Sequence, residues 1–181
     1  MQYKKIVILK NNEECVIRNA DASDAEAVYE NFILTHIQTD FLMSYADENS
    51  FGIEEERKFL VERETSENEI ELCAVINGHV VGTAGIEAVG KKDKLKHRAE
   101  FGISIEEAYW GFGIGRALTQ ACIECAREAG YSQLELDVVA ENVRAVSLYK
   151  SIGFSEYGRN PRGFRSRKTG WQELILMRME L

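Results

Sequence analysis

Three alternating glycines near the middle of the chain form the segment best suited to bind a ligand. Residues 110–116 read W-G-F-G-I-G-R and lie between a predicted strand and the start of a strongly amphipathic predicted helix. Glycines let a backbone approach a ligand closely, and the unpaired N–H groups and positive dipole end of a helix attract phosphate. The segment therefore predicts a diphosphate cradle. The alternative, that the glycines only make a tight turn, is disfavoured by the helix that they open.

Two common nucleotide sites match this segment poorly. A P-loop requires a lysine followed by serine or threonine after its glycines, and neither pair is present here. A Rossmann dinucleotide site is the stronger rival, because Asp137 lies roughly 20 residues downstream at the end of the next predicted strand. However, the spacing is G-x-G-x-G rather than G-x-G-x-x-G, and too little chain follows for a second βαβ half. A dinucleotide-binding protein is therefore a less favoured alternative.

Hydrophobic periodicity places this loop in a domain that mixes helices and strands. Apolar residues that alternate with polar ones predict strands, and apolar residues at three- and four-residue steps predict helices. The predicted strands cover residues 6–9, 16–18, 72–76, 80–88, 98–106, 134–138, 154–157 and 172–179, and the predicted helices 23–36, 53–64, 113–130 and 142–153. Ser23 with Glu26 is a capping-box signal, and Asn77-Gly78 predicts a tight hairpin. Residues 39–52 read as irregular, which suits a binding loop or a packed connection.

Size and cysteine usage bound the class of protein. A chain of 181 residues with 45% hydrophobic residues and one proline has the usual size of a single compact domain, which we expect to span residues 1–181. Its longest apolar stretches fall short of the ~18 residues that a membrane span needs, and no signal-peptide pattern is present. Four cysteines without paired spacing favour a reducing compartment. We therefore expect a cytoplasmic protein with no membrane partner.

A C-x-x-C pair, Cys122 and Cys125, raises the question of a metal site. Zinc would need a second ligand pair, and only the isolated Cys15 and Cys73 remain. Because Cys122 and Cys125 fall on the apolar side of a predicted helix, we predict that they are small core residues. The three histidines are scattered and lack metal-ligand spacing. We expect no metal.

Charge is distributed unevenly along the chain. The net charge of −8 combines two basic segments, residues 91–98 and 159–168, with a strongly acidic remainder. This balance argues against nucleic acid as a partner. The predicted basic loop from Arg159 to Gly170 would favour a ligand that carries a carboxylate or phosphate, or an acidic protein surface, whereas the acidic remainder would attract polyamines or other cations. The sequence leaves both possibilities open.

The segment from Arg98 to Phe154, about a third of the chain, resembles the core of the GNAT superfamily of N-acetyltransferases. The matching pieces are the strand A-E-F-G-I-S-I, the loop W-G-F-G-I-G-R-A-L, the strand L-E-L-D-V and the stretch A-E-N-V-R-A-V-S-L-Y-K-S-I-G-F. The family's loop begins with Gln or Arg and continues x-x-G-x and then Gly or Ala. That pattern maps onto Trp110 to Gly115, with tryptophan as the departure.

The resemblance implies a fold and a cofactor site. The fold is an α/β (α+β) domain with a mixed, mostly antiparallel sheet, flanked by helices and splayed between the fourth and fifth strands to hold the pantetheine arm of acetyl-CoA. By this resemblance the arm bonds to the backbone of Ile103, Ser104 and Ile105, and Asn142 adds a side-chain contact. The diphosphate is implied to bind the loop residues Gly111, Phe112, Gly113, Ile114, Gly115 and Arg116. For Asn142, the alternative is an ordinary helix N-cap.

Two residues are implied to carry the chemistry. An amine must lose a proton before it attacks, because an ammonium has a pKa of ~10.4, so a base or water relay is required. Glu100 matches the strand glutamate that serves as base in the histone-acetylating branch of the family, and its alternative is a solvated or ion-paired strand residue. Tyr149 matches the tyrosine that protonates the departing sulfur, and its alternative is a half-buried aromatic. A backbone N–H from residues 103–105 would stabilise the oxygen on which charge develops.

These inferences predict an enzyme that transfers the acetyl group of acetyl-CoA directly to a primary amine of a small molecule or a protein. A non-catalytic CoA-binding regulatory domain is the alternative from another functional class. The resemblance implies that the acceptor lies near residues 32–55 and the loop between the last two strands. It also implies a homodimer as a possible assembly.

Overall fold

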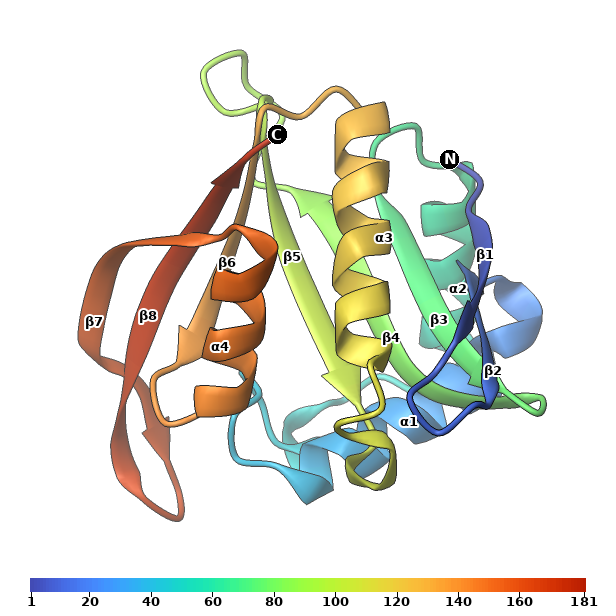
Figure 1. Ribbon diagram of the computed structural model, residues 1–181, viewed down its shortest axis with the longest axis horizontal. Coiled ribbons are helices and arrows are strands. Elements are labelled where there is room, and N and C mark those ends of the chain that lie inside the picture. The colour runs from blue at the N-terminus through green and yellow to red at the C-terminus, as the bar shows by residue number, and fades with distance from the viewer.

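An eight-stranded sheet forms the centre of the protein, as seen in a computed structural model of residues 1–181 (Figure 1). The strand order is β1-β2-β3-β4-β5-β6-β8-β7, and all neighbours are antiparallel except β5 and β6. The strands are β1 (Lys4–Ile8), β2 (Glu14–Asn19), β3 (Ile70–Ile76), β4 (His79–Ala88), β5 (Arg98–Ile105), β6 (Gln133–Val139), β7 (Ser155–Ser166) and β8 (Gly170–Glu180). The helices are α1 (Ala25–Gln38), α2 (Ile53–Thr65), α3 (Ile114–Glu128) and α4 (Val143–Ile152). None of these helices combines the length and apolar character required to cross a membrane.

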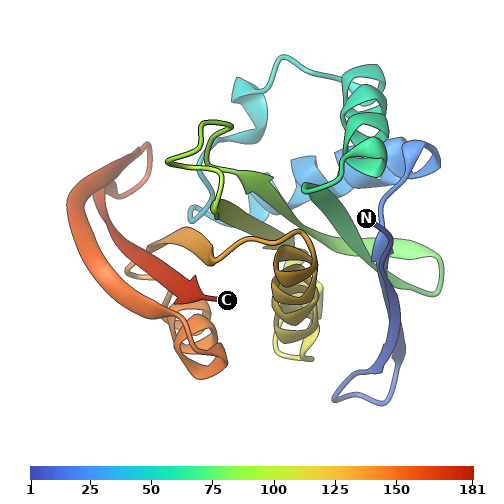
Figure 2. The same cartoon turned by 90° about the horizontal axis from the view of Figure 1, so that it is seen from above.

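Helices cover both faces of this sheet. Figure 2 shows α1 and α2 on one face and α3 and α4 on the other. The larger apolar core contains 28 buried residues and includes the inner face of α3, where Ile114, Leu118, Ala121, Cys122 and Cys125 recur at helical spacing. A smaller core of six residues packs under α1 and α2. The predicted amphipathic helix is confirmed, and its burial fixes the loop that precedes it against the end of β5.

The two parallel strands part after a short pairing. β5 and β6 pair from Arg98 with Gln133 to Glu100 with Glu135, and beyond this point both strands continue without pairing to each other. β4 stays paired with β5 throughout, from Gly82 to Ala88. If the count begins at β2, then β5 and β6 are the fourth and fifth strands, between which the family resemblance implies that the sheet is splayed. Their separation leaves one side of β5 without strand hydrogen bonds, so its backbone can bond a ligand.

The first helix begins differently from the prediction. Asp21, rather than Ser23, forms the capping box together with Asp24, and a 3-10 turn, Ala22–Asp24, precedes α1. The Asp21 carboxylate accepts hydrogen bonds from the backbone N–H of Ser23 at 2.8 Å and from its hydroxyl at 2.5 Å. The Ser23–Glu26 prediction was therefore wrong, because the serine hydroxyl donates to the earlier cap instead of capping the helix itself.

The basic segment before the last strand is mostly extended rather than a loop. Residues 159–166 belong to β7, and only a short turn, residues 167–169, separates them from β8. The pairing of β7 with β8 shifts register between Asn160 and Phe164, around Pro161. A proline lacks the N–H that a ladder requires, so a bulge accommodates it and the hairpin continues. The predicted loop from Arg159 to Gly170 was wrong for this reason.

The C-x-x-C pair belongs to the core, as predicted. Cys122 and Cys125 are buried, and all four cysteines are free thiols. Burial raises the pKa of the Cys122 thiol well above its ordinary value, so this side chain stays neutral. The pair contributes to the packing of α3 and not to a reactive site.

Candidate functional site

The glycine loop adopts a conformation that requires glycine. Gly111 has φ = +87° and Gly113, the N-cap of α3, has φ = +108°. This left-handed region is unfavourable for residues with a side chain. At neither glycine would an added Cβ meet another heavy atom within 4 Å. The backbone conformation at these two positions therefore requires glycine, and the space beside them is open.

The amides of this loop have no protein partners. None of the backbone N–H groups from Gly111 to Arg116 donates a hydrogen bond to the protein, and the first bonded N–H of the helix is that of Ala117, which donates to Gly113 at 3.1 Å. The C=O of Phe112 accepts a bond from the N–H of Lys10 at 3.0 Å, which ties the loop to the β1–β2 turn. Unpaired N–H groups at the start of a helix form an anion-binding site.

Trp110 connects the loop to β5 and α4. Its indole N–H donates to the C=O of Ile105 at 2.8 Å, and the guanidinium of Arg144 lies 5.2 Å from its ring centroid. The tryptophan therefore anchors the loop through its side chain and holds the Arg144 guanidinium over its ring. Arg116 donates to the hydroxyl of Ser151 at 2.6 Å, so its guanidinium also lies beside α4.

Asn142 acts as the N-cap of α4. Its side-chain oxygen accepts from the N–H of Ala145 at 3.3 Å. Asn142 is thus a helix N-cap, as the alternative interpretation predicted, and the cap uses only its side-chain oxygen. Its amide NH₂ donates to no protein group, so a ligand contact remains compatible with the cap.

The alternation of residues along β5 determines which of its backbone groups face the gap between β5 and β6. The N–H of Glu106, directly after β5, donates to Val81 at 3.0 Å, so its backbone faces β4. Because consecutive residues of a strand face opposite sides, Ser104 also faces β4, whereas Ile103 and Ile105 face the gap between β5 and β6. Of these three residues, the geometry directs two toward a ligand in the gap and leaves the Ser104 backbone paired.

Tyr149 is held in an aromatic cluster on α4. Its ring packs edge-on against Phe101 of β5 and Phe154, with centroid distances of 6.0 Å and 5.9 Å. The hydroxyl makes no hydrogen bond to the protein and is not fully enclosed. Burial and the neighbouring Cys122 thiol raise the pKa of Tyr149 well above its usual value. The phenol is therefore protonated at neutral pH and free to donate a hydrogen bond.

Glu100 lies on the opposite face of the sheet, where β5 and β6 begin to part. It has no hydrogen bond or ion pair, whereas its neighbour Glu135 is paired with Arg98 at 2.7 Å. Desolvation, followed by repulsion from Asp137, Glu87 and Glu135, raises the pKa of Glu100. A carboxylate with a raised pKa and no partner has the properties of a proton acceptor.

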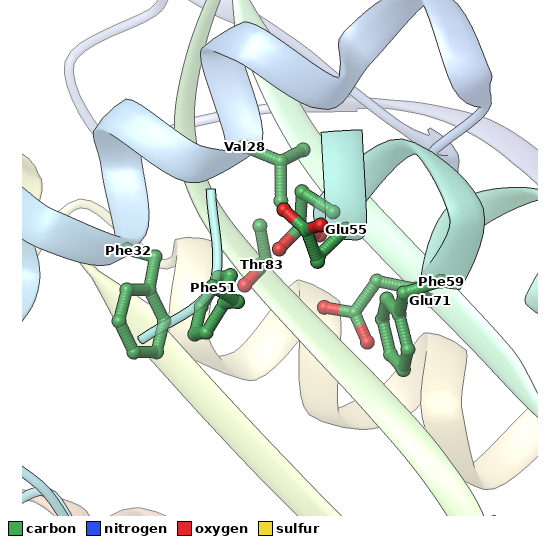
Figure 3. A pocket seen from close by; sticks show the side chains of 8 residues that line it. Val28, Phe32, Phe51, Glu55, Phe59, Glu71 and Thr83 are labelled. Carbon is green, nitrogen blue, oxygen red and sulfur yellow. The ribbon is translucent and has the colours of Figure 1, made fainter. Parts of the chain in front are cut away.

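A cavity of about 440 Å³ lies between α1, α2 and the sheet, on the face of the sheet that carries Glu100 (Figure 3). It is lined by three phenylalanines, three glutamates, a valine and a threonine: Val28, Phe32, Phe51, Glu55, Glu56, Phe59, Glu71 and Thr83. Sequence reasoning did not identify it. The available signal was Glu71, a carboxylate within the otherwise apolar strand I-E-L-C-A-V-I.

Glu71 lies in the floor of this cavity. Its carboxylate occupies the place where Gly85, on the adjacent strand, would carry a side chain. Burial and then repulsion from Glu56 raise the pKa of Glu71 to about 8. Gly102 is the Cα partner of Gly85, and an added Cβ there would meet nothing within 4 Å. Two side-chain-free positions therefore connect Glu71 with the edge of β5.

Thermal unfolding will test the charge state of Glu71. Its pKa rises from 4.5 to about 8 on folding, so its ionisation costs the fold stability as pH increases from 4.5 to 8. Glu71→Gln has no such cost. We expect its melting temperature to exceed that of wild type at pH 8 by on the order of 5 °C, with a smaller difference at pH 5.

The charged groups around Glu71 determine how far its pKa is shifted. Glu56 and Glu87 raise its pKa and Arg63 lowers it. Glu62→Gln, at an exposed position of α2, is the matched control and should leave the melting temperature unchanged at both pH values. A Glu71→Gln variant that is no more stable than wild type at pH 8 would show that Glu71 is ionised at little cost.

Hydrogen bonds and ion pairs join the β7–β8 turn to the connection between α1 and α2. The hydroxyl of Ser166 donates to Asp40 at 2.5 Å, and the N–H of Arg167 donates to the hydroxyl of Tyr45 at 2.7 Å. The Arg167 guanidinium pairs with Asp47 at 2.7 Å and with Glu48 at 3.2 Å. This arginine is already neutralised, which weakens the expectation that the basic segment recruits an anionic ligand.

Comparison with known proteins relates this arrangement to acetyltransferases. A model of the acetyltransferase (GNAT) family matches residues 33–154. A GNAT-family acetyltransferase from Streptococcus pneumoniae, known from its crystal structure, shares 30% sequence identity with this chain. The two structures superpose with a TM-score of 0.88 over 92% of this chain and 99% of the other.

Curated relatives match a shorter stretch. The N-alpha-acetyltransferase RimI of Mycobacterium tuberculosis is 34% identical over 88 residues, which are 49% of this chain and 53% of that protein. The L-amino acid N-acetyltransferase AaaT of Escherichia coli is 34% identical over 89 residues, 49% of this chain and 54% of that protein. The chain thus spans about half the length of these curated relatives.

Proposed function

The chain belongs to the acetyltransferase (GNAT) family, and from this premise we propose that it transfers the acetyl group of acetyl-CoA directly to a primary amine of a small molecule or a protein. The observation that carries the proposal is the row of unpaired amides from Gly111 to Arg116. Six N–H groups without protein acceptors, at a helix N-terminus and beside open space at two glycines, fit the diphosphate of a coenzyme.

Several segments would hold acetyl-CoA. The amides of residues 111–116 would bind the diphosphate, and Arg144, held over Trp110, adds positive charge beside them. The backbone N–H and C=O of Ile103 and the N–H of Ile105 would bond the pantetheine arm in the gap, since the C=O of Ile105 is already bonded to Trp110. The amide NH₂ of Asn142 would donate a further hydrogen bond from the start of α4.

Proton movement is assigned to two side chains on opposite sides of the gap. Acetyl-CoA supplies an acetyl group activated as a thioester. Glu100 takes the proton that the acceptor nitrogen loses as the nitrogen–carbon bond forms, and its raised pKa suits this role. Tyr149 donates its proton as the carbon–sulfur bond breaks and the sulfur leaves with the bonding electrons. The N–H of Ile103, which faces the gap, would donate to the oxygen on which charge develops.

A panel of amines tests the proposal. Acetyl-CoA is mixed with each amine, and free thiol release is followed over time. We expect at least one primary amine to stimulate release well above the rate without amine, with an N-acetylated product of matching mass. Tertiary amines, which cannot form a stable amide, serve as matched negative controls.

The same samples separate the two alternatives. If acetyl-CoA binds but no amine stimulates thiol release, the protein is a CoA-binding regulatory domain. A thermal-shift comparison of acetyl-CoA with NAD tests the dinucleotide alternative, and stabilisation by NAD alone would overturn the proposal. The four free cysteines fit the reducing cytoplasm, where we propose that the reaction takes place.

A further inference from the structure

Glu56 is a buried carboxylate that lacks a partner. Four acidic residues are buried in the protein, and three of them, Asp24, Glu106 and Glu135, accept hydrogen bonds from arginine, asparagine or histidine. Glu56 is only 8% exposed, lines the cavity and has neither a hydrogen bond nor an ion pair. Burying a charge without compensation is costly, so this side chain is suited to a positively charged ligand in the cavity.

A second acidic side chain, Glu71, lines the same cavity. Glu71 forms no ion pair, and it lines the cavity together with Glu56, whose charge raises the pKa of Glu71. The nearest arginine, Arg63, is engaged by Glu69 and by Glu87, the latter at 2.9 Å. The protein therefore offers no free cation to these two carboxyl groups. With its pKa raised to about 8, Glu71 is largely protonated in the empty cavity at neutral pH, and a bound ammonium would favour its ionised form.

The walls of the cavity select among cations. Phe32 and Phe51 pack edge-on with a centroid distance of 5.1 Å, and Phe59 closes the other side beneath Arg63, whose guanidinium lies 4.7 Å from its ring. Figure 3 shows these rings around the carboxylate of Glu71. Ca²⁺ and Mg²⁺ prefer six or more oxygen ligands, which the apolar walls cannot supply, and no group of three or more His, Cys, Asp or Glu side chains is placed to hold a metal ion. An ammonium group on an aliphatic chain satisfies both the carboxylates and the rings.

The floor of the cavity lies on the same face of the sheet as Gly102 of β5, because Glu71, Gly85 and Gly102 are partners across adjacent strands. The Glu71 carboxylate lies over Gly85, and Gly85 pairs with Gly102 of β5, the strand that borders the gap. Neither glycine carries a side chain that would block passage across the face of the sheet. One and a half strand spacings, about 7 Å, separate Gly85 from the middle of the gap, which is roughly the length of a short aliphatic chain.

We propose that the cavity binds the distal ammonium of a short aliphatic diamine, through Glu56 and Glu71, while the other amine passes over Gly85 and Gly102 to the acetyl group. This inference rests on the acetyl transfer proposed above and names its acceptor class. It assigns the preference to the acidic cavity. It also excludes acceptors whose distal end is a carboxylate, because Glu56 and Glu71 would repel it.

Three amines that each contain four carbons test the charge requirement on the wild-type protein. Putrescine carries a second ammonium, butylamine carries a methyl group, and γ-aminobutyrate carries a carboxylate at the distal end. We expect kcat/KM for putrescine to exceed that for butylamine by at least ~10-fold, beyond the factor of two from its two equivalent amines, and γ-aminobutyrate to be the poorest. Equal values for putrescine and butylamine, or a preference for γ-aminobutyrate, would overturn the inference.

Variants then assign the preference to the cavity. Glu56→Gln and Glu71→Gln should each lower the ratio of kcat/KM for putrescine to that for butylamine by about 10-fold, because one carboxylate is replaced by a neutral amide of similar shape. Glu62→Gln, on the exposed face of α2, should leave the ratio unchanged. Unchanged ratios in both cavity variants, with melting temperatures that show intact folds, would exclude this site.

Direct binding keeps this inference separate from the transfer reaction. Calorimetric titration of putrescine into the protein without acetyl-CoA should show binding that Glu56→Gln weakens by about 10-fold. If no amine is acetylated but putrescine binds in this way, the proposed transfer is wrong and the cation site stands. If amines are acetylated but putrescine does not bind more tightly than butylamine, the transfer stands and the cation site is wrong.

Discussion

Replacing Tyr149 with phenylalanine should lower kcat by at least ~100-fold and leave the affinity for acetyl-CoA within about twofold, because positioned general acids contribute factors of this size to the rate. Phenylalanine preserves the edge-on packing with Phe101 and Phe154. The variant therefore removes only the hydroxyl, which has no protein partner whose loss would disturb the fold. Thiol release with a saturating amine gives kcat, and calorimetry gives the affinity.

A second tyrosine provides the matched control. Tyr131 is also buried, but its hydroxyl accepts a hydrogen bond from Asn68 at 2.8 Å on the far side of the core. Tyr131→Phe should lower stability slightly and leave kcat unchanged. If Tyr149→Phe retains more than half of the wild-type kcat, Tyr149 is only a packing residue, and the departing sulfur takes its proton from water.

Replacing Gly113 with alanine should weaken acetyl-CoA binding by ~10- to 100-fold. The added methyl group would project into the open space before the unpaired amides, where we place the diphosphate. Alanine at φ = +108° also strains the loop and shifts those amides. Calorimetric titration of acetyl-CoA measures the effect directly.

The other end of the same helix supplies the control for backbone strain. Gly130, which follows α3, has φ = +80°, and an added Cβ there also meets nothing within 4 Å. Gly130→Ala therefore imposes a comparable strain on α3 without approaching the cradle. We expect both variants to lose similar thermal stability but only Gly113→Ala to lose affinity. Equal affinities for the two variants would remove the diphosphate from this loop.

The glycine loop that we propose as the diphosphate site could be located from the sequence because its features are local. Gly111 and Gly113 are separated by one residue, and a regular apolar repeat predicts the helix that follows them. The structure shows left-handed φ angles at Gly111 and Gly113 and unpaired amides at the start of the helix, as such a loop permits. The order of helices and strands was predicted for the same reason, since each has its own periodicity.

The cavity could not be predicted because its parts meet only through packing. Phe32 and Glu56 come from different helices, and Glu71 and Thr83 from adjacent strands. A glutamate in a strand is usually solvated, and the sequence does not reveal that α2 covers Glu71. The contribution of Gly85 and Gly102 likewise depends on strand register, which single-strand patterns do not specify.

Competition between neighbouring residues explains the local errors. Asp21 and Ser23 are both good N-cap residues, and only the folded geometry shows that the serine donates to the aspartate. In the C-terminal hairpin, Pro161 and the clustered arginines imitate a loop, although a bulge carries the proline and the strand pairing resumes beyond it. The resemblance implies a pantetheine contact at the Ser104 backbone, which strand alternation directs toward β4, because sequence position alone does not tell which neighbouring strand a residue of β5 bonds.

The brief pairing of β5 with β6 has a mechanical consequence. Only three residue pairs join the half of the sheet that contains β1 to β5 with the half that contains β6, β8 and β7. A coenzyme inserted between the halves would supply bridging bonds that the polypeptide omits, so occupancy would stiffen the whole molecule as well as fill a site. The free energy of coenzyme binding would then also stabilise the contact between the two halves of the sheet.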